Sequence, residues 1–170
     1  LLPWENLRPK GRVDLYLVDA RTGEVSRHVG GWNVVTSWIG APTPMSGRDM
    51  MRRILVKSLA TGGFSGGLGG DTTSTVHHMV LGSGTTAETS SDVDLGVPIA
   101  ATEKNLSSVE FDAVNPYVTF VAEWAEDEAN FTMTEIGLYS ENGDFLARRS
   151  FSSFSKTWSF RLHALWLWIL

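Results

Sequence analysis

The chain has 170 residues, of which 42% are hydrophobic and 19% charged, and this composition indicates one globular domain that can bury its own core. The net charge of −5, without a basic run, argues against nucleic-acid binding. The absence of cysteine excludes disulfides and thiolate chemistry, and no apolar run approaches the ~20 residues that span a bilayer, so no membrane insertion is expected.

The N-terminal part is predicted to begin with an irregular arm over residues 1–10, followed by a single β-rich domain over 11–170. Alternating β formers predict a strand over 12–19 and a returning strand over 25–29, joined by a turn. Residues 32–39 follow as another β-like or linking segment.

One helix is predicted near 47–60, because Ser46 is a suitable N-cap and the apolar residues from Met50 to Leu59 form one stripe. A glycine-rich loop over 62–71 follows it. A Walker phosphate loop would need a Lys-Ser/Thr pair after the glycines and a helix after the loop, and this segment has neither. We therefore interpret it as a linker or as a loop that becomes ordered on assembly.

The rest of the chain has the pattern of many short strands, separated by turn signals every ten to fifteen residues. The predicted strands are 76–81, a stretch near 98–103, 108–113, 117–124, 131–139, 145–151 and 156–170. This spacing favours an antiparallel β-sandwich or barrel, and we predict a mainly β fold, an antiparallel β-sandwich with one α-helix.

The last predicted strand is unusual, because its final residues are apolar on both faces. Strict alternation places these residues on one face: Trp158, Phe160, Leu162, Ala164, Trp166 and Trp168. The other face is polar at first and turns apolar from Leu165. Such an end needs cover on both sides, and we favour a subunit interface over a central strand of the protein's own core. The interface candidates are Leu2 and Trp4 in the arm, with Leu165, Trp166, Leu167, Trp168, Ile169 and Leu170.

No enzyme signature is found, and we predict no catalytic, cofactor or metal site. His77 and His78 are adjacent, so in a regular strand they point to opposite faces and cannot share a metal ion. The acidic cluster at Glu123 and 126–128 lies at a predicted turn, where carboxylates are ordinarily solvated.

The stretch from Thr134 to Arg148 is interpreted as a strand, a tight turn and a second strand. Asn142 and Gly143 supply residues that tolerate the positive φ of a hairpin turn. Glu135 is predicted to be partly buried on the same face as Phe131, Met133 and Tyr139, and a buried carboxylate needs a cation such as Arg148 or Arg149.

The same hairpin, with Glu135, Gly137 and Tyr139 before the Asn142-Gly143 turn, resembles a segment of bacteriophage tail-collar and tail-fibre proteins. The resemblance extends over roughly residues 75–155, including 76–84 and the acidic segment 126–130. It implies a virion structural protein of the tail, neck/collar or baseplate that is assembled in the host cytoplasm. Because no long fibre shaft follows, an assembly adaptor or fibre-anchoring subunit is expected. Its partners would be further copies of itself and other tail or neck proteins, with possible fibre or host-surface contact.

A glycan-binding β-sandwich module for a host surface is the alternative function. In that case an exposed Trp32, Trp38 or Trp124 would stack on sugar rings.

Overall fold

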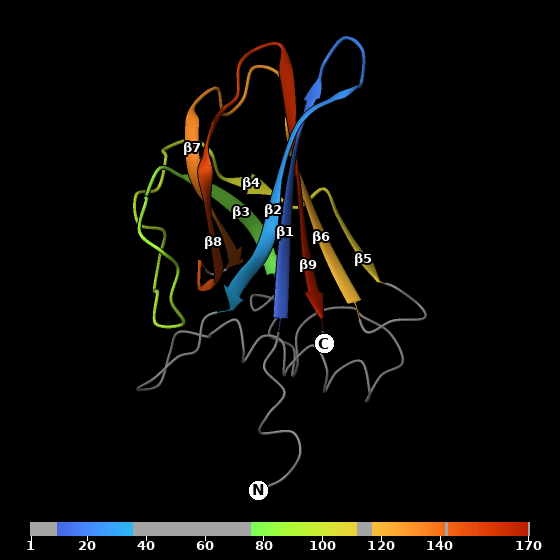
Figure 1. Ribbon diagram of the computed structural model, residues 1–170. Helices are drawn as coiled ribbons and strands as arrows, with labels where there is room; N and C mark the ends of the chain where they lie inside the picture. The colour runs from blue at the N-terminus through green and yellow to red at the C-terminus, as the bar shows by residue number, and fades with distance from the viewer. Residues whose placement is uncertain (1–9, 36–75, 112–116, 142, 170) are drawn as a thin grey trace, which may run out of the picture.

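The computed structural model describes residues 10–35, 76–111, 117–141 and 143–169. These residues form nine strands and no helix, so none of them belongs to a helix that could cross a membrane (Figure 1). The strands are β1 (Lys10–Asp19), β2 (Val25–Val35), β3 (Val76–Gly82), β4 (Lys104–Asn105), β5 (Ser108–Phe111), β6 (Tyr117–Trp124), β7 (Thr132–Ser140), β8 (Phe145–Ser155) and β9 (Phe160–Ile169). The prediction of a mainly β fold is confirmed.

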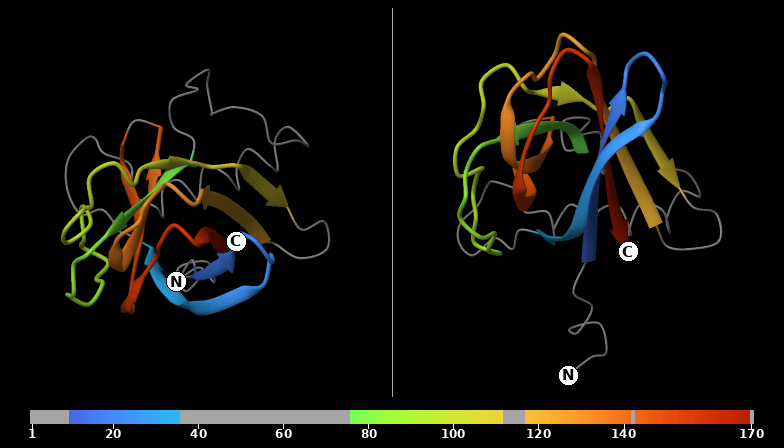
Figure 2. Two further views of the ribbon diagram at one scale, coloured as in Figure 1. Left: turned by 90° about the horizontal axis from the view of Figure 1, so that it is seen from above. Right: turned by 45° about the horizontal axis from the view of Figure 1, so that its top comes forward.

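All nine strands belong to one antiparallel sheet in the order β4-β3-β7-β8-β2-β1-β9-β6-β5. The sheet curls into a half-barrel around its core, instead of forming the two separate layers of the predicted sandwich (Figure 2). The two halves are joined where Val34 and Val35 of β2 pair with Arg148 and Ala147 of β8.

The continuity of β2 explains this difference from the prediction. Two separate segments, 25–29 and 32–39, are predicted on either side of Gly30 and Gly31, and glycine inside a strand weakens the strand signal. In the structure these glycines are needed for close packing: a Cβ on Gly30 would lie 2.1 Å from Asp14 Oδ1, and one on Gly31 would lie 2.7 Å from an Arg149 nitrogen. The strand therefore runs through both glycines and carries the chain from one half of the sheet to the other.

Most strand predictions agree with the structure to within a few residues. The predicted strand near 98–103 is wrong, because only an isolated bridge between Gly82 and Pro98 forms there and the next strand begins at Lys104. The last strand begins at Phe160, so Trp158, which is predicted to belong to this strand, lies in a turn and is exposed. The arm over 1–9, the helix near 47–60 and the glycine-rich loop 62–71 lie outside the described residues.

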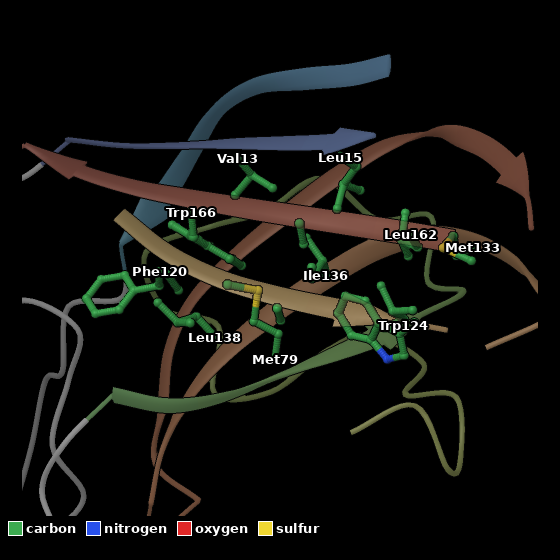
Figure 3. Close-up of a cluster of buried hydrophobic side chains, with 14 of the residues drawn as sticks. Val13, Leu15, Met79, Phe120, Trp124, Met133, Ile136, Leu138, Leu162 and Trp166 are labelled. Carbon is green, nitrogen blue, oxygen red and sulfur yellow. The ribbon is translucent and has the colours of Figure 1, made fainter. Parts of the chain in front are cut away.

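The core lies on the inner face of the curled sheet (Figure 3). Four alternating residues of β9 are fully buried there, namely Leu162, Ala164, Trp166 and Trp168. The Trp124 ring is also buried, and its Nε1–H donates to the Thr102 carbonyl at 2.9 Å. Burial of a large apolar side chain contributes about 1.5–3 kcal/mol, so this aromatic layer is a major source of stability.

The first of two register shifts in the pairing of β7 with β8 decides which residues of β7 reach the site described below, and the second adds an extra residue to β8. The two shifts lie between Met133 and Glu135 and between Leu138 and Tyr139. A bulge of this kind changes the face on which the following residues lie. As a result Met133, Ile136 and Leu138 are in the inner core, whereas Glu135, Gly137 and Tyr139 are on the outer face. The prediction that Met133 shares a face with Glu135 is therefore wrong.

Candidate functional site

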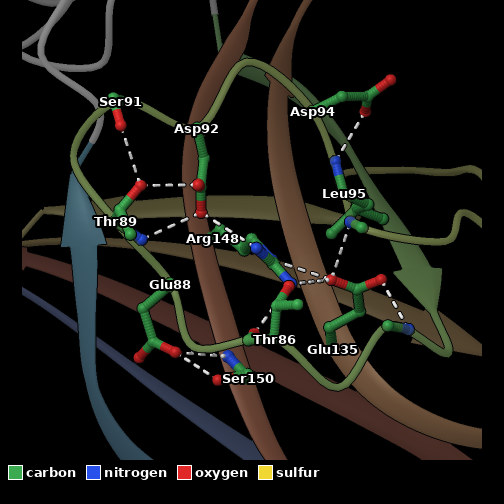
Figure 4. A network of polar contacts seen from close by, with 12 residues as sticks. Thr86, Glu88, Thr89, Ser91, Asp92, Asp94, Leu95, Glu135, Arg148 and Ser150 are labelled. Carbon is green, nitrogen blue, oxygen red and sulfur yellow. Dashed lines mark hydrogen bonds and ion pairs between the residues drawn. The ribbon is translucent and has the colours of Figure 1, made fainter.

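The side chain of Glu135 fastens a surface loop, residues 83–98, to the outer face of β7 (Figure 4). Glu135 is completely buried. Its Oε1 accepts the backbone N–H groups of Gly84 and Val97, both at 2.8 Å, and its Oε2 accepts that of Gly96 at 3.0 Å. One carboxylate therefore ties together both ends of the loop.

Arg148 of β8 completes this arrangement. Its Nε and one terminal nitrogen lie 2.8 and 2.7 Å from Glu135 Oε2, and the other terminal nitrogen lies 3.0 Å from Asp92 Oδ2. Arg148 also donates to the carbonyl and hydroxyl oxygens of Thr86. The prediction that Glu135 is buried with an arginine partner is confirmed, and that partner is Arg148. We call Glu135, Arg148 and Asp92 the clamp.

The surroundings of Asp92 and Arg148 favour their ionised forms. Partial burial opposes ionisation of Asp92, but hydrogen bonds from Thr89 and Arg148 outweigh it and hold the pKa of Asp92 below its usual value. Burial likewise acts to lower the pKa of Arg148, but Asp92 and Glu135 raise it overall. Each buried charge is thus compensated by a hydrogen-bonded opposite charge, which is the condition for burying charges at tolerable cost.

Glu88 attaches the loop at a second point. Its carboxylate lies 2.7 Å from Arg149 and accepts hydrogen bonds from the backbone N–H and the hydroxyl of Ser150. Partial burial opposes ionisation of Glu88, but its bonds to Ser150 and Arg149 lower its pKa overall. Arg149, the other predicted partner of Glu135, therefore forms its ion pair with Glu88 instead.

Glycines leave the space that the clamp needs. A Cβ on Gly82 or Gly84 would lie 2.6 or 2.4 Å from Glu135 Oε1, and one on Gly137 would lie 2.8 Å from the Tyr139 ring. These distances are too short for any other residue without displacement of buried atoms.

A small apolar cluster lies beneath the same loop. Leu95 of the loop packs with Tyr139 and Phe145, and the partly buried Val80 adjoins them. The Tyr139 hydroxyl donates to Asp94 Oδ1 at 2.5 Å, and burial together with this carboxylate raises the tyrosine pKa well above its usual value. Of the three motif residues, Glu135 and Tyr139 thus bind the loop, and Gly137 leaves the space that the Tyr139 ring and Leu95 occupy.

The turn after β7 has the predicted hairpin form. Gly143 has a φ of 82°, and its N–H donates to the Ser140 carbonyl at 3.0 Å. Asn142 lies outside the described residues.

The two adjacent histidines do not behave as predicted. The pairing of β3 shifts between Val76 and His78, and the Nδ1 atoms of His77 and His78 lie 3.3 Å apart. The His78 ring stacks on Tyr139, and burial lowers its pKa. Even so, no group of three or more histidine or acidic side chains in the described part of the chain is placed to hold a metal ion.

The acidic turn at 125–130 is organised by a buried lysine that sequence reasoning did not single out. Lys156 Nζ donates to the carbonyls of Glu126 and Glu128 and to the Asn130 side chain, at 3.1, 2.6 and 3.2 Å. The Glu126 and Glu128 carboxylates instead pair with Arg161 and Lys104, and both have lowered pKa values because of these hydrogen bonds. The carboxylates are therefore ion-paired, not merely solvated as predicted.

The interface candidates at the C-terminus are separated by the pleat of β9. Trp166 and Trp168 are buried in the inner core, whereas Leu165, Leu167 and Ile169 lie half-buried on the outer face, between β1 and β6. Leu2, Trp4 and Leu170 lie outside the described residues.

Trp32 of β2 adds an exposed aromatic side chain to this outer face. Its exposed fraction is 55%, and the pairing places it beside Arg12, which in turn pairs with Leu167. Trp32, Leu165, Leu167 and Ile169 together are called the outer patch. Of the other tryptophans considered for glycan binding, Trp124 is buried, which excludes it, and Trp38 lies outside the described residues.

Comparison of the chain with protein-family models, with curated proteins and with solved structures finds no match. The function must therefore be argued from the residues themselves.

Proposed function

We propose that the protein is a structural subunit of a bacteriophage virion, in the tail, neck/collar or baseplate. It would act as an assembly adaptor or fibre-anchoring subunit, in contact with further copies of itself and with other tail or neck proteins. The resemblance of the hairpin around Glu135 to tail-collar and tail-fibre proteins suggests this function. The observation that carries it is the apolar outer patch.

The outer patch has the chemistry of a protein interface. Leu165, Leu167 and Ile169 are only half-buried, and Trp32, which is separated from Leu167 by Arg12, is mostly exposed. Tryptophan and arginine are enriched at the centres of protein interfaces, and exposed apolar side chains that gather on one face commonly mark an interaction site.

A non-catalytic role agrees with the use of the described charged residues. The carboxylates of the clamp bind backbone N–H groups and an arginine, and Glu126 and Glu128 of the acidic turn are ion-paired. These groups stabilise loops and turns, which is what a subunit needs in order to present fixed surfaces to its neighbours.

The test is the oligomeric state of the purified protein, measured by light scattering over a range of concentrations. We expect a defined oligomer in the wild type and dissociation in Leu167→Asp, because a charge would be placed in the apolar contact. Val25→Asp, at an exposed position near the tip of the β1–β2 hairpin, is the matched control and should leave the oligomer intact. A wild type that stays monomeric at every concentration would contradict self-assembly.

The glycan-binding alternative is favoured by one observation, the exposure of Trp32. Its flat ring lies beside Arg12, and the neighbouring Asp14 carboxylate is held by Arg12 and His28 at 2.7 and 2.8 Å. An exposed indole next to fixed polar groups suits stacking on a sugar ring. A glycan array probed with the wild type and with Trp32→Ala tests this function, and binding by the wild type alone is the expected result.

A further inference from the structure

We propose that copies of this chain associate head to tail, with loop 83–98 of one copy docked on the outer patch of the next. This inference rests on the proposed role in assembly and specifies which two surfaces meet. It follows from the chemistry, the rigidity and the positions of the two surfaces.

The loop carries the most exposed large hydrophobic side chain of the described residues. The exposed fraction of Val93 is 84%, and that of Val97 is 52%. Both valines lie next to residues that are fixed from beneath, since Asp92 binds Arg148 and the Val97 N–H binds Glu135. A loop already held in one conformation loses little entropy on docking, which favours its use as a contact surface.

The charges of the two surfaces are complementary. Loop 83–98 has three acidic residues and no lysine or arginine. Arg149 and Arg148 bind two of them, Glu88 and Asp92, which leaves Asp94 as the exposed carboxylate of the loop. On the outer patch side, the ion pair of Arg12 and Asp14 is unequally exposed, at 45% for the arginine side chain and 16% for the aspartate. The loop therefore offers branched apolar side chains with one exposed carboxylate, and the patch offers an indole and aliphatic side chains next to a half-exposed guanidinium.

The two surfaces belong to different halves of the sheet. The loop covers the outer face of β3, β7 and β8, whereas the outer patch lies on β2 and β9 (Figures 1 and 2). Pairing two outer patches face to face would leave the valines of both loops exposed, whereas the head-to-tail contact covers both surfaces. A contact between two different surfaces repeats from copy to copy and gives a closed ring or an open filament.

The experiment uses two variants, each with one damaged surface: Val93→Asp in the loop and Trp32→Asp in the patch. Each variant alone should be monomeric where the wild type is assembled, with self-association weakened about thirtyfold or more, as for a central interface residue. An equimolar mixture should form a one-to-one heterodimer and nothing larger, because only one pair of intact surfaces remains. Formation of the heterodimer also shows that both variants are folded.

The readout is sedimentation velocity with one variant fluorescently labelled, with Val25→Asp as a control that should assemble like the wild type. Loss of assembly in Trp32→Asp but not in Val93→Asp, without a heterodimer on mixing, would indicate face-to-face pairing and overturn the inference. Assembly that persists in both variants would overturn it as well, while leaving the proposed function intact. A wild type that is monomeric throughout would overturn the inference, together with the self-assembly part of the proposed function.

Discussion

The two halves of the curled sheet differ in how their outer faces are covered. The outer face of β3, β7 and β8 lies beneath loop 83–98, where Leu95, Tyr139 and Phe145 form a small apolar cluster and the clamp supplies buried charges. The outer face of β2 and β9 also carries apolar side chains, but its leucines and isoleucine are only half-buried and Trp32 is exposed.

Apolar residues on the outer face of this sheet therefore have two roles: some pack beneath a loop of the same chain, and others remain accessible to a partner. On the first face, the chain provides its own cover and fixes it with ionic hydrogen bonds, which are directional. On the second face, the described residues leave apolar area accessible, and a partner that covers it would gain the free energy of that burial. The clamp should therefore affect folding, whereas the outer patch should affect assembly.

The largest effect is expected from Glu135→Gln, which leaves the buried guanidinium of Arg148 without its main counter-ion. Breaking a buried pair in this way costs about 3–5 kcal/mol, so the free energy of unfolding in urea should fall by that amount. Glu110→Gln, at an exposed position of β5, makes the same chemical change and should alter stability by less than about 0.5 kcal/mol. Equal stability of the two variants would show that the clamp does not hold the fold.

Gly84→Ala should have a smaller effect on the same region. The added methyl group would meet Glu135 Oε1 at 2.4 Å, so the loop must shift away from its anchor. Overpacking of this kind costs about 1–3 kcal/mol, and hydrogen exchange should become faster at the amides of Gly96 and Val97. The neighbouring Ser83→Ala, at an exposed side chain, should leave both stability and exchange unchanged.

Acid should loosen the loop before the inner core unfolds. Asp92 and Glu88 have lowered pKa values in the folded protein, so their stabilising effect is complete above the unfolded pKa values and is lost as the pH falls through the folded ones. Exchange protection at the amides of residues 84–97 should therefore decrease below about pH 4. The amides of β9 are the internal reference, and loss of protection at both places in parallel would contradict a separate opening of the loop.

The smallest effect on folding is expected from Leu167→Asp in the outer patch. Its side chain is only half-buried, so the free energy of unfolding of the monomer should change by about 1 kcal/mol or less. Leu162→Ala, on the inner face of the same strand, removes a fully buried side chain and should cost about 2–5 kcal/mol. Both free energies of unfolding are measured with urea on dilute protein. If Leu167→Asp lowered this free energy as much as Leu162→Ala does, Leu167 would belong to the core and the two faces of β9 would not differ.

The sequence by itself determined most strands, the hairpin turn at Gly143 and the burial of Glu135 with an arginine. Local alternation and turn chemistry carry this information, since a strand shows its two faces in every second residue. The alternation of β9 correctly separated Trp166 and Trp168 from Leu165 and Leu167, although it did not say which set faces the core. The outcome is that the tryptophans are in the core and the leucines on the outer face.

Only the tertiary structure decided the rest, because it depends on contacts between residues distant in sequence. A register shift in the pairing of β7 with β8 places Met133 and Glu135 on opposite faces of the sheet. A second shift, in the pairing of β3, accompanies the approach of the His77 and His78 imidazole rings. Neither shift can be predicted from the local sequence pattern. The choice of Arg148 over Arg149, the buried Lys156 and the passage of β2 from one half of the sheet to the other were likewise set by packing. Residue type determined which groups needed a partner, and the curl of the sheet determined which partner each one met.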